Sequence, residues 1–477
     1  MTNDGRPPAP PGPVIADRLA ALHGSTRNVG NGIYLGFGAG GWAWAEPERS
    51  TLVLGPSRSG KTSSLVIPNV LAAPGAVVST STKPDVLDAT VGARATCGAV
   101  LVFDPSGTVE VPPGALKVGW SPVVTSQDWD VALSVASAMV QSSHPVHGAG
   151  GSQKIETHWS ERASALLAPL LHAAALDDVP MRGVLSWVDR HNGSEALTIL
   201  SQRVGEHHLA TDVLAGILTT DGRELSGIWS TASGALAAYR SEAALASTEP
   251  PYLDAAAFCR GAHTLYICAA GRHQRLAAPL VVGIVSDVRD AAYDRARQGV
   301  ADPPVLLALD EVANIAPLPD LPALVSEGAG QGLLTLACLQ DLSQGRHRWG
   351  PEAASFLSLF GTTVVLPGIA DRDTLRALSE LAGDHEVLTR TVSRSPGPGG
   401  RLQTGLSVSG VVRPRLAPDV AARGRDGFAL ALDHRNRLGW VGLTPARTTP
   451  PWRDLVDLTR ARERMAATGD GRARAGR

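Results

Sequence analysis

Cysteine is scarce in this chain of 477 residues, and the four that occur form no CxxC pair. They are Cys97, Cys259, Cys268 and Cys338. The lack of close pairs argues against a zinc site and against a disulfide framework, so we expect a reducing, cytoplasmic compartment. Long apolar runs are missing too, because none approaches the ~18 residues that a membrane-spanning helix needs. The Pro-rich first residues do not resemble a secretory signal peptide.

An excess of positive charge is also missing. The 43 Lys and Arg residues are balanced by 45 Asp and Glu residues, which leaves a net charge of −2. This balance excludes a globally basic nucleic-acid-binding protein, so any contact with DNA has to be local. Lysine itself occurs only at Lys61, Lys83, Lys117 and Lys154. A lysine in so Arg-rich a chain is a candidate for a site that needs a compact ammonium group.

Apolar residues are plentiful by contrast. Hydrophobic residues make up 44 % of the chain and charged residues 18 %, which is typical of a globular protein of roughly two to three domains. Strands are predicted at residues 51–54, 76–79, 99–103, 264–269, 305–309, 333–339 and 362–366. Helical patterns lie between them, for example from Thr62 and over residues 275–297. This alternation predicts an α/β fold with a mostly parallel sheet and helices on both faces.

A long stretch without strand patterns interrupts this alternation. Its apolar residues, among them Trp159, Ala163 and Leu166, recur at helical spacing. An all-helical inserted domain is therefore predicted, with short strands and turns from residue 386 onward. The predicted organisation is a mobile arm (1–30), an α/β domain in two parts (31–127 and 250–450), the helical insertion (128–249) and an Arg-rich tail (451–477).

Two Gly-rich segments precede the first helix, and only one of them has the context that its motif needs. Residues 31–54 are predicted to form a hairpin whose bend contains Gly36-x-Gly38-x-x-Gly41, a pattern found in dinucleotide-binding proteins. We reject that function, because a strand pattern follows where the motif requires a helix.

The second segment matches the phosphate-binding loop G-x-x-x-x-G-K-[ST], and it lies between an apolar strand and a helix. Glycines let consecutive backbone N–H groups surround a phosphate, and the positive end of the following helix favours an anion there. Lys61 is expected to reach the β- and γ-phosphates of ATP, while the Thr62 hydroxyl binds Mg²⁺. The predicted nucleotide-binding residues are Gly55, Pro56, Ser57, Arg58, Ser59, Gly60, Lys61, Thr62 and Ser63.

Polar side chains follow two other predicted strands. The apolar strand 305–309 ends in Asp310 and Glu311. Asp310 is expected to hold the Mg²⁺ shell, and Glu311 to orient and polarise the attacking water. The strand 333–339 ends in Gln340, whose amide is predicted to sense the γ-phosphate. Lys61, Glu311 and Gln340 are thus the candidate catalytic residues, and Thr62 and Asp310 the candidate metal ligands.

Five segments in order carry a resemblance to a known family. They are GPSRSGKTSSLVIPNVL, VVSTSTKPDVLDAT, VFDP, LDEVANIAPLPDLPALVSEG and LACLQDLSQ. The chain resembles, over most of residues 30–450, the coupling proteins of type IV secretion systems, which are conjugative DNA-transfer ATPases, and the actinobacterial forms above all. The resemblance implies a RecA-like P-loop ATPase domain that an all-helical domain interrupts. It also implies a homo-oligomeric ring, typically of six subunits.

The partners follow from the same resemblance. Such a ring passes single-stranded DNA with its attached relaxase toward the components of a type IV secretion channel, at the inner face of the plasma membrane. By position, Gly55–Thr62 correspond to the family's phosphate loop, Asp310 and Glu311 to its acids, and Gln340 to its third nucleotide motif. Lys83 and Asp85 lie in its second-strand segment.

The sequence departs from the family in two respects. Relatives usually begin with membrane-spanning helices, and no such helix is predicted here. Either a separate partner supplies the membrane anchor, or the protein works away from the membrane. Many relatives also carry an arginine in the helix end after the acidic pair, where residues 326–332 have Ala329 and no arginine. Arg346, Arg348 or Arg372 is expected to substitute for it, or turnover is slow.

Local positive charge offers candidate DNA contacts. Residues 387–418 contain Arg390, Arg394, Arg401, Arg413 and Arg415 and no acid, so they form either a phosphate-binding surface or a solvated hairpin. The Arg-rich tail is either disordered or a patch for DNA or acidic lipid. His144 and His147 are expected in a loop rather than at a metal.

Three functions remain open from the sequence. The first is an ATP-driven motor for single-stranded DNA, and the second is an ATPase that docks protein cargo through the helical insertion. The third is a nucleotide-gated scaffold with little turnover, which the lack of an arginine at Ala329 favours.

Overall fold

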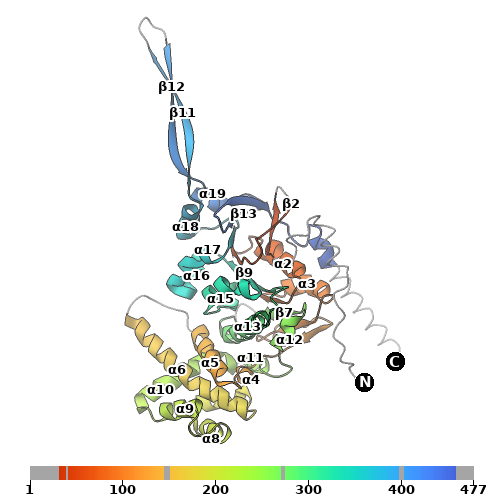
Figure 1. Ribbon diagram of the computed structural model, residues 1–477, viewed down its shortest axis with the longest axis vertical. Coiled ribbons are helices and arrows are strands. Elements are labelled where there is room, and N and C mark those ends of the chain that lie inside the picture. The colour runs from red at the N-terminus through yellow and green to blue at the C-terminus, as the bar shows by residue number, and fades with distance from the viewer. Residues whose placement is uncertain (1–31, 39–40, 144–150, 270–273, 397–401, 458–477) are drawn as a thin grey trace, which may run out of the picture.

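The computed structural model describes residues 32–38, 41–143, 151–269, 274–396 and 402–457. Its centre is a large sheet with the strand order β2-β1-β14-β13-β10-β3-β9-β8-β4-β7-β5-β6 (Figure 1). From β10 to β6 all neighbouring strands are parallel, whereas β13, β14, β1 and β2 are joined by antiparallel pairing. The strands are β1 (Tyr34–Gly38), β2 (Gly41–Trp44), β3 (Thr51–Leu54), β4 (Val77–Ser81), β5 (Val100–Phe103), β6 (Ala115–Lys117), β7 (Thr264–Cys268), β8 (Val305–Leu309), β9 (Leu333–Leu339), β10 (Thr362–Val365), β13 (Phe428–Asp433) and β14 (Leu438–Gly442).

The central strands are buried on both faces, which is why their sequences are almost entirely apolar. Alternate residues of β3 enter two separate cores: Leu52 and Leu54 pack in one, and Val53 in the other. The first core includes side chains of α13 (Gln274–Arg297), α14 (Val312–Ile315), α15 (Leu321–Glu327) and α16 (Leu342–Trp349). The second includes α2 (Ile67–Ala72), α3 (Asp85–Arg94) and Trp452.

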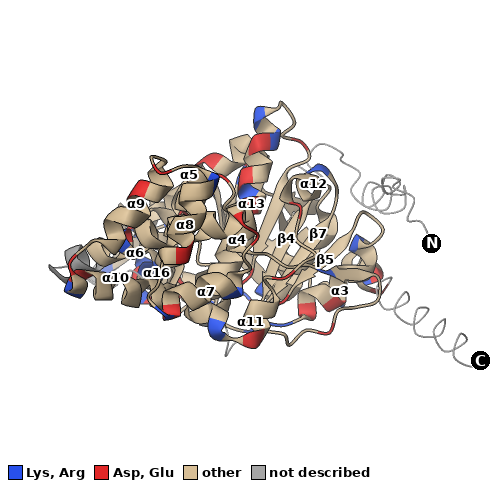
Figure 2. Ribbon diagram, turned by 90° about the horizontal axis from the view of Figure 1, so that it is seen from below, with Lys and Arg blue, Asp and Glu red and all other residues tan. Residues whose placement is uncertain are grey.

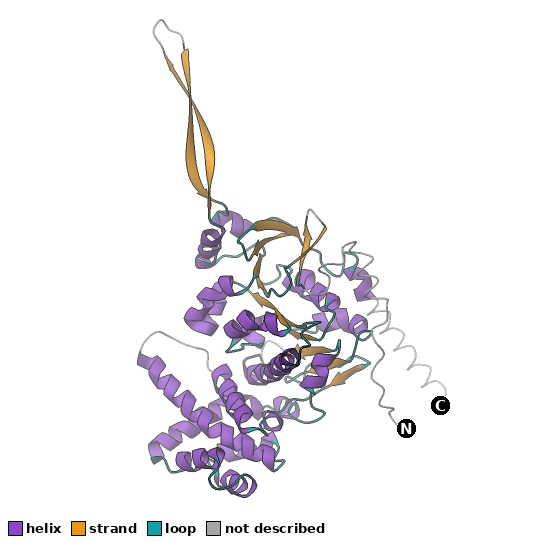
Figure 3. Ribbon diagram, viewed as in Figure 1, coloured by secondary structure: helices purple, strands orange, loops and turns teal. Residues whose placement is uncertain are grey.

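A region of helices lies at one end of the molecule, below the sheet in Figure 3. It joins the α/β part mainly through α5, which packs on α13. Its longest helix, α6, packs against α5, α8, α9 and α10. The helices between β6 and β7 are α4 (Pro122–Thr125), α5 (Trp129–Ser143), α6 (Gly151–Leu176), α7 (Met181–Asp189), α8 (Ser194–Arg203), α9 (Leu209–Leu218), α10 (Gly222–Ala235), α11 (Glu242–Ala246) and α12 (Ala255–Arg260). The exact boundaries of a helical domain stay a prediction.

The predicted strands of the parallel sheet are observed, with ends that differ by at most two residues. Strands β8 and β9 have the predicted bounds, because at both of them an apolar run, which contains only Thr335 as a polar residue, ends in polar residues. The predicted hairpin over residues 31–54 is only partly correct. Strands β1 and β2 pair with each other, but β3 leaves them and takes a place inside the sheet between β10 and β9. Its four residues are all buried, which suits a central strand rather than a hairpin arm.

The helix predicted from Thr62 begins with a π-turn, residues Thr62–Val66, before α2 continues it. Pro68 has no N–H to donate to the carbonyl one turn earlier, which explains why the regular ladder is displaced here. Asn69 compensates with its side chain. Its amide nitrogen donates to the carbonyls of Leu65 and Tyr34, both at 2.9 Å, and its oxygen accepts from the Tyr34 N–H at 2.7 Å.

The largest departure from the expectation of short strands after residue 386 is a long hairpin. Strands β11 (Asp384–Pro396) and β12 (Leu402–Pro414) pair with each other alone and project from the end of the molecule opposite the helical region (Figure 1). Polar residues occur throughout both strands because neither faces a core. The hairpin starts and ends beside α18 (Arg372–Ala382) and α19 (Pro418–Arg423), which pack on each other. Helix α17 (Phe356–Leu359) precedes β10.

Trp120 links the entry to the helical region with α13. Its indole N–H donates to the Asp287 carboxylate at 2.7 Å, and its ring lies over Gly283, where a Cβ would come within 2.0 Å of it. Glycine is therefore required for this close approach. Burial raises the pKa of Asp287 to about 7, although the bond from Trp120 opposes the rise.

Replacing Asp287 by asparagine should stabilise the protein in a pH-dependent manner. Because the folded pKa lies above the unfolded value, the native state keeps a proton that the unfolded chain releases near pH 4. The contribution of the Asp287 carboxyl to the free energy of unfolding is thus fully present below about pH 4 and is lost as the pH rises to about 7. Asp287→Asn avoids this loss, which amounts to about 4 kcal/mol at pH 8 and about 1.5 kcal/mol at pH 5. Thermal denaturation at both pH values measures the difference.

The exposed Asp290 on the same helix provides the matched control. Asp290→Asn should change the free energy of unfolding by no more than about 0.5 kcal/mol at either pH. An Asp287→Asn variant whose gain is the same at pH 5 and pH 8 would contradict the assignment of a buried, proton-binding carboxyl.

Candidate active site

The candidate site lies at the carboxyl edge of the parallel strands. The order β3-β9-β8-β4 brings four strand ends together, with the Gly-rich loop after β3, Gln340 after β9 and the two acids after β8. Strand β9 separates the loop from the acids by one strand. Residues that lie some 250 positions apart in the sequence therefore converge because parallel strands end at the same edge.

The loop folds back on itself around the lysine ammonium. Lys61 is buried, and its Nζ donates to the carbonyl oxygens of Gly55 at 2.6 Å and Pro56 at 2.9 Å. The Gly55 N–H donates to the Leu339 carbonyl at 3.1 Å, which anchors the loop to β9. Gly55 has no room for a side chain, because a Cβ would lie 2.9 Å from the Cβ of Leu366. The sequence therefore needs glycine at this first loop position.

The other loop residues differ in exposure. Ser57 and Arg58 are exposed, while Pro56, Ser59, Gly60, Thr62 and Ser63 are half-buried. Arg58 (φ +65°) and Gly60 (φ +97°) both have left-handed backbone angles, which turn successive N–H groups toward the same side. The Ser59 hydroxyl is buried and without a hydrogen-bond partner. A polar atom in that position is unsatisfied until a ligand with acceptor or donor groups enters the loop.

Asp310 contacts the first residue after the lysine. The Thr62 hydroxyl donates to its Oδ2 at 2.5 Å, and the Thr80 hydroxyl on β4 donates to its backbone carbonyl at 3.2 Å. Burial raises the pKa of the Asp310 carboxyl to about 6, the Thr62 hydroxyl opposes this rise, and the Glu311 carboxylate adds to it. A buried carboxylate beside a hydroxyl fits a divalent cation, since both are hard oxygen ligands.

Glu311 begins α14 in a left-handed conformation, with φ +55°. Such a backbone costs a residue with a side chain about 1 kcal/mol, and strain of this kind is concentrated at functional sites. The Asn314 amide lies 3.3 Å from its Oε2, and the carboxylate is only half-buried. Glu311 therefore stays accessible to water next to the buried Asp310.

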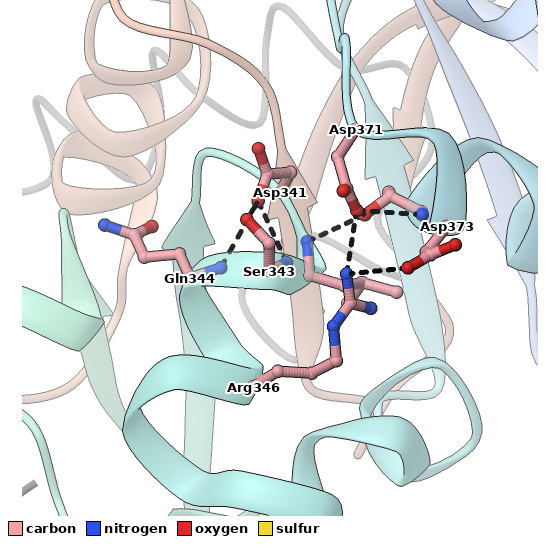
Figure 4. A network of polar contacts seen from close by, with 8 residues as sticks. Asp341, Ser343, Gln344, Arg346, Asp371 and Asp373 are labelled. Carbon is pink, nitrogen blue, oxygen red and sulfur yellow. Dashed lines mark hydrogen bonds and ion pairs between the residues drawn. The ribbon is translucent and has the colours of Figure 1, made fainter. Parts of the chain in front are cut away.

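Gln340 lies between the loop and the acids, at the end of β9. Its backbone N–H donates to the Gln344 side chain at 2.9 Å, which fixes the start of the following turn. Asp341 caps α16 by accepting from the N–H groups of Ser343 and Gln344 (Figure 4). The predicted position of Gln340 beside the loop is thus observed, whereas its role in sensing a phosphate stays a prediction.

Two of the three arginines proposed as substitutes have other partners. Arg346 pairs with Asp371 and Asp373 at the start of α18 (Figure 4), with a distance of 2.9 Å to Asp371 Oδ2. Arg348 is largely buried and donates to the Ser142 carbonyl, and burial lowers its pKa to about 10. Arg372 is exposed at the first position of α18. Of the three, Arg372 is the only one that is exposed.

Sequence reasoning missed Thr80 and the unsatisfied Ser59 hydroxyl. Thr80 is one of three consecutive polar residues in the fully buried strand β4, and this could have signalled a polar contact with the neighbouring strand. Asp85 lies at the same edge, where it accepts from the Ser81 hydroxyl at 3.2 Å. Lys83 is exposed.

The candidate DNA contacts lie elsewhere in the molecule. Arg390, Arg394 and Arg413 belong to the projecting hairpin, and Arg415 donates to the Asp384 carbonyl at its base. Arg401, His144 and His147 lie outside the described residues, as do the predicted arm at 1–30 and residues 458–477 of the tail. The described part of the chain contains no cluster of three His, Cys, Asp or Glu side chains suited to a metal ion.

Comparison with known proteins gives a family and a fold. The family described as "Type IV secretory system Conjugative DNA transfer" matches residues 14–423. The bacterial conjugative coupling protein TrwBdeltaN70, in an unbound form, is similar with a TM-score of 0.66 and 19 % identity, over 89 % of this chain and 91 % of that one. The plasmid coupling protein TrwB in complex with ADP and Mg²⁺ matches with a TM-score of 0.63 and 18 % identity, with the same coverage. None of the curated proteins matches the chain.

These likenesses confirm the predicted fold class, a RecA-like α/β fold whose mostly parallel sheet is interrupted by helices. Within the described residues no helix is both long enough and apolar enough to span a bilayer.

Proposed function

The chain belongs to the type IV secretory system conjugative DNA transfer family, and from this premise we propose that it is an ATP-hydrolysing motor for single-stranded DNA. The observation that carries the ATPase proposal is the contact of the Thr62 hydroxyl with the Asp310 carboxylate at 2.5 Å. It joins the phosphate-binding loop to the acidic strand end, as hydrolysis at this edge of the sheet requires. The solved coupling protein TrwB binds ADP with Mg²⁺ and a non-hydrolysable ATP analogue, which supports the same ligands here.

The loop residues would hold the triphosphate of ATP. The Lys61 ammonium exchanges its two carbonyl partners for phosphate oxygens, and backbone N–H groups at the start of the π-turn face the same anion. The buried Ser59 hydroxyl gains a partner when the loop is filled. Thr62 and Asp310 would hold Mg²⁺, which when bound offsets negative charge on the phosphates.

Glu311 is the residue placed to act on water. Its half-buried carboxylate orients the attacking water and accepts its proton, while the neighbouring Asp310 remains ionised at neutral pH because its pKa is about 6. Gln340 would contact the γ-phosphate from the strand between the loop and the acids. The exposed Arg372 would act on the nucleotide of an adjacent subunit in a homo-oligomeric ring, which we propose to be hexameric.

The DNA part of the proposal predicts that single-stranded DNA increases ATP turnover. Figure 2 shows acidic and basic residues interspersed over the face that carries the helical region, so a DNA contact there has to be local. In a steady-state ATPase assay of the full chain, added single-stranded DNA should raise the rate several-fold. Its effect should weaken between 50 mM and 200 mM salt, because phosphate contacts are salt-dependent.

Turnover that single-stranded DNA leaves unchanged would contradict the DNA motor. Stimulation by a purified relaxase without DNA would then favour the second candidate, an ATPase that docks protein cargo for the secretion channel. Arg346 and Arg348 already bond to Asp371 and to the Ser142 carbonyl, and this favours the third candidate, a scaffold with little turnover. Near-zero hydrolysis in the assembled ring would support it.

A further inference from the structure

The hairpin β11–β12 has no protein core on either side. Its strands of 13 residues pair with each other from Asp384 opposite Pro414 outward, and neither pairs with another strand (Figure 3). A two-stranded sheet is marginally stable in water by itself. A projecting ribbon of this length therefore indicates a surface that something else covers.

The register divides the side chains of the hairpin between two unlike faces, because directly paired residues lie on the same side of a sheet. The first, which we call the aliphatic face, carries exposed Leu and Val side chains from both strands. Their exposed fractions are 70 % for Leu388, 56 % for Val392, 66 % for Leu406, 53 % for Val408 and 68 % for Val412. The opposite, hydroxyl face carries Thr389, Thr391, Ser393, Ser407 and Ser409.

The aliphatic face is an unusual feature for a surface in water. Isolated exposed apolar residues are common, but a contiguous group on a projecting element marks an interaction site. Leu388, Val392, Leu406 and Val408 follow one another in the register, so their side chains form one stripe along the ribbon.

Positive charge shares this face. Arg390 pairs directly with Val408, and Arg394 lies two residues beyond Val392, so both arginines project on the aliphatic side. Glu386, which pairs with Val412, lies on the same face near the base of the hairpin, and beyond it residues 387–412 contain no acid. Aliphatic side chains interspersed with arginines match the surface of an anionic bilayer, where Leu and Val enter the acyl boundary and Arg contacts lipid phosphates.

Two other occupants fit the hairpin less well. Residues 384–414 contain no Phe, Tyr or Trp, whereas proteins that bind single-stranded nucleic acid combine basic residues with aromatic stacking platforms. A hairpin of a second copy would bring arginines against arginines, and such like charges oppose pairing at an exposed strand edge.

We propose that the aliphatic face of the β11–β12 hairpin binds the surface of an anionic lipid bilayer. The hairpin lies flat in the headgroup region, because the N–H and C=O groups along its two free edges need water or headgroup partners. The helical region lies at the end of the molecule opposite the hairpin, so it is remote from the ribbon that contacts lipid (Figure 1). This binding goes beyond the proposed ATPase function and needs no nucleotide.

Co-sedimentation of the full chain with vesicles tests the proposal. In the absence of nucleotide, we expect binding to vesicles of phosphatidylglycerol and phosphatidylethanolamine and little binding to pure phosphatidylcholine. Replacing Leu388, Val392, Leu406 and Val408 by Thr, which keeps a high strand propensity, should weaken binding at least tenfold. Arg390→Gln with Arg394→Gln should weaken it about 30-fold on the anionic vesicles, at about fivefold for each arginine.

The hydroxyl face supplies the matched control, because Thr389→Ser with Thr391→Ser should leave vesicle binding unchanged. A second variant removes most of the hairpin: with residues 387–411 replaced by Asn-Gly, the chain should bind no vesicles and should still bind ATP. Equal binding by wild type and the four-Thr variant would overturn the proposal. A second result would also overturn it: single-stranded DNA displaces the vesicles from the wild type, and the hairpin variants lose DNA binding along with vesicle binding. The hairpin would then be a nucleic-acid site.

Discussion

Glu311→Gln should reduce ATP turnover by a factor of about 10²–10⁴ and leave ATP binding nearly unchanged. The amide keeps the size of the side chain and its place at the start of α14, but it cannot accept a proton from the attacking water. The loop, Lys61 and the pair Thr62–Asp310 stay intact. Turnover is measured under saturating ATP and Mg²⁺, and affinity by titration with a fluorescent nucleotide.

Asp341→Asn is the control for this substitution. It changes a carboxylate to an amide on the next strand end, where the side chain only caps α16. It should lower stability by about 1 kcal/mol or less and change turnover little. A Glu311→Gln variant that hydrolyses ATP at the wild-type rate would remove Glu311 from the mechanism and leave its backbone strain unexplained.

Lys61→Ala should weaken ATP binding about 10- to 150-fold and abolish measurable turnover. When ATP is bound, the ammonium would donate to phosphate oxygens in place of the Gly55 and Pro56 carbonyls, and a charged hydrogen bond is worth about 1.5–3 kcal/mol. Its loss also leaves these two carbonyls without the donor. Calorimetric titration with ATP and Mg²⁺ measures the affinity.

The exposed Lys83 distinguishes a specific role of Lys61 from a general loss of positive charge. Lys83→Ala removes the same charge at the same edge of the sheet, and it should retain ATP affinity within about threefold because Lys83 is exposed and its charge is screened by solvent. Comparable losses in both variants would mean that the loop binds nucleotide through its backbone alone.

The parts of the molecule that the sequence predicts well share one property: their pattern follows from burial. Strands β8 and β9 are apolar except for Thr335 because both of their faces are covered, and the polar residues that follow them mark the edge of the sheet. The loop was predictable from its motif and from its place between an apolar strand and a helix. The convergence of the loop with Asp310 followed from strand polarity alone.

Other features depend on contacts that no local pattern encodes. The place of β3 inside the sheet is set by pairing with β9 and β10, which lie hundreds of residues later. The hairpin β11–β12 was predicted only as one of two alternatives for residues 387–418, and the length of its strands was missed because neither strand packs on a core that would mark its ends. The partners of Arg346 and Arg348 were equally hidden, since Asp371 and Ser142 approach them only in the folded chain.

The Asn69 side chain connects two elements of the fold. It forms hydrogen bonds with both the N–H and the carbonyl of Tyr34 in β1, while its own backbone belongs to α2, which follows the phosphate loop and the π-turn. If that helix tilts when nucleotide binds, we expect Tyr34 and the first strand to follow, because separating them would break two hydrogen bonds between buried groups. The hydrogen bonds of Asn69 therefore connect the candidate nucleotide site to the edge of the sheet where β1 and β2 lie.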